Sequence, residues 1–194
     1  MCHDSTLLTG EIMNTLIVNI FGEPSAGKST AATYIFSQLK MQGISAEYVS
    51  EFAKDKIWEN NDEVFKFQTY IFGKQNFKLA RVNGKVDVVI TDSPIILSMI
   101  YNPNPSIQKE LNALIMKVFS LYNNYNILLI RKHSYENNGR HENESEARKV
   151  RDKIVKTCID NNIPLQLCET NKNTYDKVVN DIINQIHNNK ERKD

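Results

Sequence analysis

The residues with the clearest chemistry form one short run near the start of the chain. The run Gly22–Thr30 contains the pattern G-x-x-x-x-G-K-[ST] and directly follows the apolar stretch 15–21, as a loop between a strand and a helix requires. Its glycines let the backbone wrap around a phosphate, and successive N–H groups supply partial positive charge. Lys28 adds a full charge as a catalytic residue, and Ser29 is suited to hold magnesium. The run therefore predicts a loop that binds ATP and Mg²⁺ through Gly22, Glu23, Pro24, Ser25, Ala26, Gly27, Lys28, Ser29 and Thr30.

Two acidic residues are expected to lie near this loop. Asp92 follows the apolar segment 86–91, at the carboxyl end of what should be a central strand. We assign it a catalytic and metal-binding role, although it could also cap a helix that begins near Pro94. Glu51 directly follows the expected strand at 45–50, so parallel strands bring it to the same edge of the sheet. It could accept a proton from an attacking hydroxyl, orient a substrate or cap a helix, and we assign it to catalysis and substrate binding.

Arginines gather after the fourth expected strand, in and beyond the segment 132–145. This segment is predicted to be a lid whose arginines close over the β and γ phosphates and exclude water. Interspersed acids also allow a solvated charged loop. We assign Arg140 to catalysis and Arg131 to ATP binding, and we expect Arg148 and Arg151 at the surface.

A substrate pocket is suggested by polar and aromatic residues in the expected helix 62–82 and beyond it. An amide can read the edge of a pyrimidine, and an aromatic ring can stack on it. Phenylalanines at helical spacing are more often part of the core. We therefore predict substrate contacts only for Gln68 and Tyr101.

Composition limits the classes of protein that fit. The chain has 194 residues, 41% of them hydrophobic, and a formal net charge of +1, which indicates one α/β domain with one core. So little net charge argues against a large basic face for duplex nucleic acid, but it allows brief or single-stranded contact. The cysteines predict neither a disulfide framework nor a zinc site, and they fit a reducing cytoplasm: Cys2, Cys158 and Cys168. No apolar run approaches the length that crosses a bilayer, so no membrane association is expected.

Strand and helix patterns alternate along the chain. Strands are expected at 15–21, 45–50, 86–91, 125–131 and 163–168, and helices at 28–41, 53–60, 62–82, from Pro94, 106–121, 144–159 and 174–187. This order predicts an α/β fold of the P-loop NTPase class, with a doubly wound five-stranded parallel sheet flanked by helices, as in nucleotide kinases. We expect a flexible leader at 1–13, a single domain at 14–187 and a disordered tail at 188–194.

Other P-loop classes fit less well. A regulatory GTPase would need D-x-x-G after the third strand, where this chain has Asp92-Ser93-Pro94-Ile95. A large remodelling ATPase would need additional modules that this length does not hold. A small kinase fits best, and an ATP-binding switch protein with slow hydrolysis stays open as an alternative.

Five segments together resemble a group of bacteriophage P-loop kinases that are similar to thymidylate kinases. These segments are 22–30, 51–54, 70–75, 84–94 and 138–140, and the resemblance covers the chain from Asn14 to about Ile163. The group includes enzymes that phosphorylate 5-hydroxymethyluracil within viral DNA. The resemblance thus implies a kinase that transfers the γ-phosphoryl group of ATP to that hydroxymethyl group, in a transient contact with DNA in the host cytoplasm.

Small-molecule acceptors are a second possibility. Glu51-Phe52-Ala53 and the acid after the third strand are similar to the nicotinamide riboside kinase family. Thymidylate and deoxynucleoside kinases usually carry an arginine directly after that acid, whereas Ser93 follows Asp92 here. This departure argues against the 5′-phosphate of a free nucleotide as the acceptor. Nucleoside, nucleotide and nicotinamide riboside kinases stay open as alternatives, and so does a homodimer.

Overall fold

The computed structural model describes residues 15–132 and 144–191 and confirms the predicted fold class. Its centre is a five-stranded sheet in the order β2-β3-β1-β4-β5, and every neighbouring pair of strands is parallel. The strands are β1 (Leu16–Phe21), β2 (Ala46–Val49), β3 (Val88–Thr91), β4 (Asn123–Ile130) and β5 (Gln166–Glu169). β1 is buried on both faces, which explains its uninterrupted apolar character.

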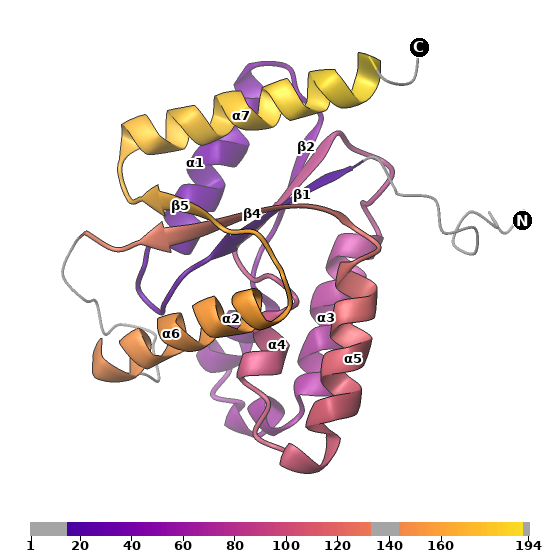
Figure 1. Ribbon diagram of the computed structural model, residues 1–194, viewed down its shortest axis with the longest axis vertical. Coiled ribbons are helices and arrows are strands. Elements are labelled where there is room, and N and C mark those ends of the chain that lie inside the picture. The colour runs from indigo at the N-terminus through magenta and orange to yellow at the C-terminus, as the bar shows by residue number, and fades with distance from the viewer. Residues whose placement is uncertain (1–14, 133–143, 192–194) are drawn as a thin grey trace, which may run out of the picture.

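Helices cover both faces of the sheet (Figure 1). One face carries α1 (Lys28–Met41) and α7 (Lys172–Glu191), which pack on Leu16, Val18 and Ile20 of β1. The other face packs on Ile17 and Phe21. That second layer contains α3 (Gln68–Ala80), α4 (Leu97–Ile100), α5 (Gln108–Phe119) and α6 (Glu144–Asp160). Alternate residues of β1 therefore serve two separate cores.

The strand order creates a crevice at one edge of the sheet. From β1 the chain passes through α1 to β2, and from β3 it crosses to β4 on the opposite side of β1. The loops after β1 and β3 consequently leave in opposite directions, and ligands bind at such switch points in open α/β sheets. Asn19 and Thr91 are register partners near the ends of these two strands. The sheet thus brings the loop after Phe21 and the acid after Thr91 to one place.

Between β2 and α3 lie two short elements, α2 (Phe52–Trp58) and the 3-10 helix η2 (Asp62–Lys66). Neither contributes a fully buried residue. We expected one continuous helix at 62–82, which is wrong: Phe67 has φ −115° and ψ 71°, so the chain turns there before α3 begins.

Several other boundaries differ from those expected. Pro94 starts a turn, and α4 begins only at Leu97. A short 3-10 helix, η3 (Pro105–Ile107), precedes α5, because the Asn104 side chain accepts a hydrogen bond from the backbone N–H of Ser106. α7 continues to Glu191, four residues beyond the expected end of the domain at His187.

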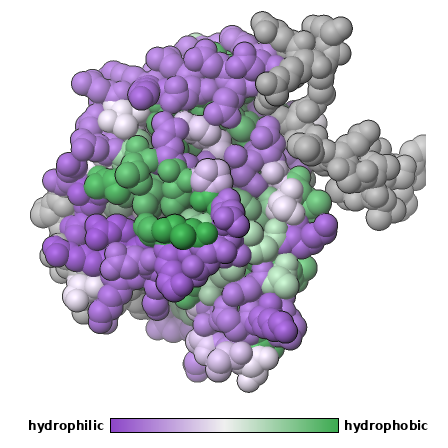
Figure 2. Space-filling model, in the orientation of Figure 1, coloured by the Kyte–Doolittle hydropathy of each residue, from purple (hydrophilic) through white to green (hydrophobic). Residues whose placement is uncertain are grey.

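The surface seen in Figure 2 is mostly hydrophilic. Hydrophobic side chains gather between the surfaces of α7 and α6, where β5 forms the edge of the sheet. Leu167 of β5 is 68% exposed. Within the described ranges, no helix is both long and apolar enough to cross a lipid bilayer.

Candidate active site

The loop between β1 and α1 is tightly folded. Ser25 and Gly27 have φ values of 63° and 78°, in the left-handed region, and the N–H of Ala26 donates to the carbonyl of Glu23 at 3.1 Å. A Cβ atom on Gly22 would lie 3.1 Å from the Cβ of Ala26, so only glycine fits there without a shift. The loop leads directly into the first turn of α1, whose N–H groups favour a phosphate.

Lys28 lies in that first turn and reaches back over the loop. Its Nζ donates hydrogen bonds to the carbonyls of Gly22 and Glu23, each at 3.1 Å. The loop carbonyls therefore hold the ammonium group beside the turn that the motif predicts to bind phosphate.

Asp92 is fixed by two donors from the β2 side of the sheet. The hydroxyl of Tyr48 donates to its Oδ2 atom at 2.7 Å, and the backbone N–H of Glu51 donates to Oδ1 at 3.0 Å. Only 3% of Asp92 is exposed. These bonds, rather than a helix cap, define the environment of this carboxylate.

The pKa of Tyr48 shows which other groups meet at this point. Burial raises this pKa above its ordinary value, as do the hydrogen bond to Asp92 and the charges of Asp92 and Glu51. A hydrogen-bonding interaction with the Ser29 side chain acts in the opposite direction. Ser29 from α1 and Asp92 from the end of β3 thus both interact with the Tyr48 hydroxyl.

The two oxygen donors fit magnesium. A hydroxyl and a carboxylate are hard ligands, and Mg²⁺ usually takes one or two protein oxygens and completes its shell with water and substrate phosphates. In the part of the chain that the structure describes, no group of three or more histidines, cysteines or acids gathers to hold a metal ion. Ser29 and Asp92 would accordingly hold Mg²⁺ together with the phosphates.

Arg131, the residue just after β4, forms an ion pair with Glu23 of the loop. Its Nε donates to Oε1 of Glu23 at 2.8 Å, and the two side chains are only 7% and 3% exposed. The Oε2 atom of Glu23 is buried without a hydrogen-bond partner in the described structure. The structure thus links Arg131 to a residue of the phosphate loop, and its contact with ATP stays a prediction.

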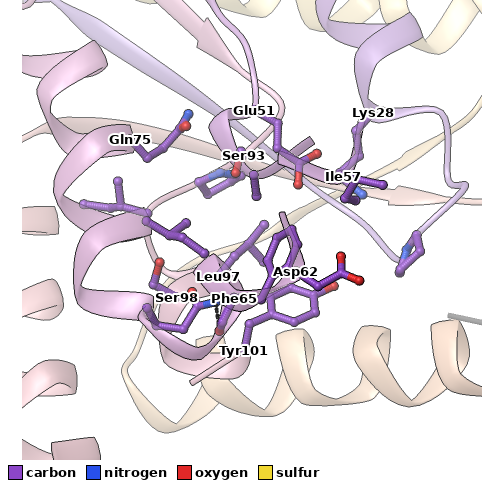
Figure 3. Close-up of a pocket in the computed structure, with 16 residues that line it drawn as sticks. Lys28, Glu51, Ile57, Asp62, Phe65, Gln75, Ser93, Leu97, Ser98 and Tyr101 are labelled. Atoms are coloured by element: carbon purple, nitrogen blue, oxygen red, sulfur yellow. Dashed lines mark hydrogen bonds between the residues drawn. The ribbon is translucent and has the colours of Figure 1, made fainter. Parts of the chain in front are cut away.

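A cavity of about 440 Å³ adjoins the loop (Figure 3). Lys28 and Glu51 lie at one end of it, and Phe65, Ser98 and Tyr101 lie at the other. Its full lining is Pro24, Lys28, Glu51, Ala53, Ile57, Asp62, Phe65, Gln68, Ile71, Gln75, Ser93, Pro94, Ile95, Leu97, Ser98 and Tyr101. The cavity therefore joins apolar walls to a few polar groups, as small-molecule sites do.

Gln75 fastens the turn that carries Glu51. Its Oε1 accepts from the N–H of Phe52 at 3.1 Å, and its Nε2 lies 3.4 Å from the carbonyl of Ser50 and 3.3 Å from the hydroxyl of Thr91. The amide is buried and engaged on both sides. Its role here is to tie β2, α3 and β3 together.

A family model described as an AAA domain, AAA_28, matches residues 17–176. The chain belongs to this AAA domain family. The protein RecA of Macrococcus caseolyticus (strain JCSC5402) is 28% identical over 116 residues, which are 56% of this AAA domain chain and 32% of that protein.

Two solved structures share the fold of this AAA domain. A NadR protein in complex with NR has a TM-score of 0.65 at 14% identity and covers 89% of this chain and 52% of its own. A deoxyadenosine kinase from M. mycoides with products dcmp and a flexible dcdp bound has a TM-score of 0.53, also at 14% identity, over 87% of this chain and 99% of its own. The chain spans about a third of the RecA protein and about half of the NadR chain. Its fold is thus that of P-loop kinases.

The structure brings most of the residues proposed from the sequence of this AAA domain to one edge of the sheet. Gln68 and Tyr101 both line the cavity, and Gln68 donates to the carbonyl of Phe65 at 3.3 Å. Arg148 is exposed on α6, and Arg151 lies 3.7 Å from Asp152. Arg140 and most of the expected lid at 132–145 lie outside the described residues, as do the leader 1–13 and the end of the tail.

Sequence reasoning missed three residues at this site. Tyr48 was not singled out, because its bond to Asp92 spans 44 positions. Asp62 and Ser98 line the cavity from η2 and α4, but nothing in their sequence context distinguishes them from surface and core residues. Only the strand order, which a single sequence does not carry, could have revealed the pairing of Tyr48 with Asp92.

Proposed function

We propose that this chain is a magnesium-dependent kinase that transfers the γ-phosphoryl group of ATP to a hydroxyl group held in the cavity. The observation that carries the proposal is that Lys28 of the phosphate loop and Glu51 line the same end of that cavity. A hydroxyl bound there would face the loop on one side and a carboxylate on the other. Excluding water from such a site favours transfer over hydrolysis.

The donor half of the reaction is assigned to the loop. Backbone N–H groups of the loop and the ammonium of Lys28 would bind the β and γ phosphates and neutralise the charge that spreads over the transferring group. Ser29 and Asp92 would hold Mg²⁺, which supplies further neutralisation of the phosphates when bound. Tyr48 and the N–H of Glu51 keep the oxygens of Asp92 in one orientation.

The acceptor half is assigned to Glu51. Its carboxylate would orient the acceptor hydroxyl and take its proton as the new oxygen–phosphorus bond forms. The bond between the γ phosphorus and the bridging oxygen of ATP breaks, and ADP leaves. Positioning contributes more than base strength in the loose transition states of phosphoryl transfer.

For the acceptor we propose the hydroxymethyl group of 5-hydroxymethyluracil in viral DNA. This choice rests on the sequence resemblance to bacteriophage kinases. It is compatible with the cavity, because Phe65 and Tyr101 offer aromatic rings and Gln68 an amide for an extruded base. This proposal places the protein in the host cytoplasm and leaves a homodimer open.

Free nucleosides are the second candidate. The cavity volume of about 440 Å³ is in the range of small-molecule sites, and NadR and the deoxyadenosine kinase share the fold. Ser93, rather than an arginine, follows Asp92 and lines the cavity. This favours an uncharged acceptor over a nucleotide with a 5′-phosphate.

The test is to incubate γ-labelled ATP with DNA that contains 5-hydroxymethyluracil, with free nucleosides, with nucleoside monophosphates and with nicotinamide riboside. We expect label in the modified DNA, and none with Lys28→Ala. Label only in a free nucleoside would replace the DNA acceptor with the second candidate. Hydrolysis of ATP with no labelled acceptor would contradict a kinase and favour a switch protein.

A further inference from the structure

The solvent side of α3 carries a line of aromatic and basic side chains. Phe67, Tyr70, Lys74, Phe77 and Arg81 recur every three or four residues, from the residue just before α3 to the residue just after it. They therefore share one side of the helix over about 21 Å. The three aromatic residues are 60%, 44% and 65% exposed, and both basic residues are exposed. We call these five residues the α3 stripe.

These aromatic rings are not needed to hold α3 in place. The opposite side of the helix buries Ile71, Phe72 and Leu79 in the fold. Exposed apolar residues that are scattered singly are normal, but three rings in one line mark a binding surface more often. Tyr70 is also held in position, because the ring of Phe52 meets it edge-on with centroids 5.6 Å apart.

The stripe lies in a segment of positive charge. Residues 67–86 contain four basic side chains and no acid: Lys74, Lys78, Arg81 and Lys85. On the preceding elements, by contrast, Lys56 pairs with Glu59 and Lys66 pairs with Glu63. Within residues 15–132 and 144–191, none of the four is in an ion pair with an acid. Charge on the stripe is therefore available to a negatively charged partner.

The α3 stripe and the residues of α3 that line the cavity lie on different sides of the same helix. Gln68, Ile71 and Gln75 line the cavity, while the stripe faces solvent. We infer that the α3 stripe binds single-stranded DNA, with its rings stacked on bases and Lys74 and Arg81 near phosphates. Aromatic rings interleaved with cations are the pattern of single-strand surfaces, and rings can stack only on unpaired bases. The inference rests on the proposed DNA acceptor and gives the strand that carries the reactive base a place to lie.

The experiment measures binding of a fluorescein-labelled oligothymidylate by anisotropy, with no ATP present. We expect wild-type protein to bind, and Phe77→Ala and Lys74→Glu each to weaken binding roughly tenfold. Phe77→Trp should retain binding, because it keeps a stacking surface. Lys177→Glu makes the same charge change on α7, across the sheet, and should bind as wild type does. Lys74→Ala should lower the salt slope of log K by about 0.7.

Three results would overturn the inference: no binding by wild-type protein, undiminished binding by the stripe variants, or equal displacement of the strand by a polyglutamate peptide. Thermal unfolding of each variant checks that the fold is intact, and the lower salt slope of Lys74→Ala is the test if the harsher changes disturb it. The result is separable from the kinase proposal. Strand binding that depends on the stripe without any label transfer supports the surface and rejects the kinase, whereas transfer to free nucleosides with no strand binding does the reverse.

Discussion

Tyr48 donates a 2.7 Å hydrogen bond to Asp92 across the boundary between β2 and β3. The carboxylate that we assign to magnesium is thus oriented by Tyr48 of β2 and by the backbone of Glu51, which lies just after that strand. Metal-site donor residues commonly depend on such outer partners, and losing one typically costs about 10–100-fold in metal affinity or activity.

Replacing Tyr48 with phenylalanine should therefore weaken the response to magnesium. We expect the Mg²⁺ concentration for half-maximal activity to rise about tenfold. Calorimetric titration should show weaker binding of ADP in the presence of Mg²⁺ and unchanged binding in its absence. Tyr125→Phe is the matched control, because Tyr125 also donates from a partly buried position, to Gln166, far from the loop. An equal effect of both changes would mean that Tyr48 has only a structural role.

The ion pair between Glu23 and Arg131 should be important for stability. Arg131→Met leaves the Glu23 carboxylate buried without its cation, and breaking such a pair costs about 3–5 kcal/mol. The double variant Glu23→Gln/Arg131→Met should recover much of this loss. Urea unfolding measures both free energies. A double variant as unstable as the single one would show that the pair itself is not what the fold depends on.

Gln75→Leu should impair catalysis through the position of Glu51. The change keeps the volume of the side chain but removes its hydrogen bonds to the turn at 50–52, so it should cost about 1–3 kcal/mol of stability. We expect kcat to fall while the KM for ATP stays the same, because the donor loop is untouched. Asn76→Ala, at the next position, removes only a bond with Tyr122 and should preserve kcat. A parallel rise in the KM for ATP would contradict this division.

The two cysteines that the structure describes, Cys158 and Cys168, should be unreactive in the folded protein. Burial raises the pKa of Cys158 and of Cys168 to about 11, whereas unfolded thiols ionise near pH 8.5. The unfolded state therefore loses protons first, and these two groups make stability fall as the pH rises from about 9 to 11. In a Cys2→Ser background, iodoacetamide at pH 8 should label neither residue until urea is added. Fast labelling without urea would show that the thiols are more open than their burial implies.

How much the sequence reveals depends on how far apart the interacting residues lie. Gly22 to Thr30 are contiguous, so their spacing alone predicts the loop. Glu51 and Asp92 follow segments that read as strands, and parallel strands then bring them to one edge. The bonds of Tyr48 to Asp92 and of Arg131 to Glu23 span 44 and 108 positions and depend on strand order, which no local pattern carries.

The sequence pattern also does not determine where α3 begins or which of its amides is free to meet a ligand. The apolar pattern at 62–82 is continuous, yet the backbone of Phe67 interrupts it. Gln68 and Gln75 look alike in the sequence. The Gln75 amide, however, forms hydrogen bonds with the backbone of Ser50 and Phe52, whereas the Gln68 amide donates to the nearby carbonyl of Phe65. Tertiary contacts decided between the two amides.

The short elements α2 and η2 line the cavity beside the phosphate loop without supplying a fully buried residue. Substitutions in α2 and η2 should therefore cost little folding stability. Substitutions in β1 disturb both cores, and substitutions in the loop disturb the predicted phosphate site. Substitutions at 52–66 can therefore change the cavity wall while the phosphate loop and the sheet stay intact. Under the proposed function, related chains could change their acceptor more readily than their use of ATP.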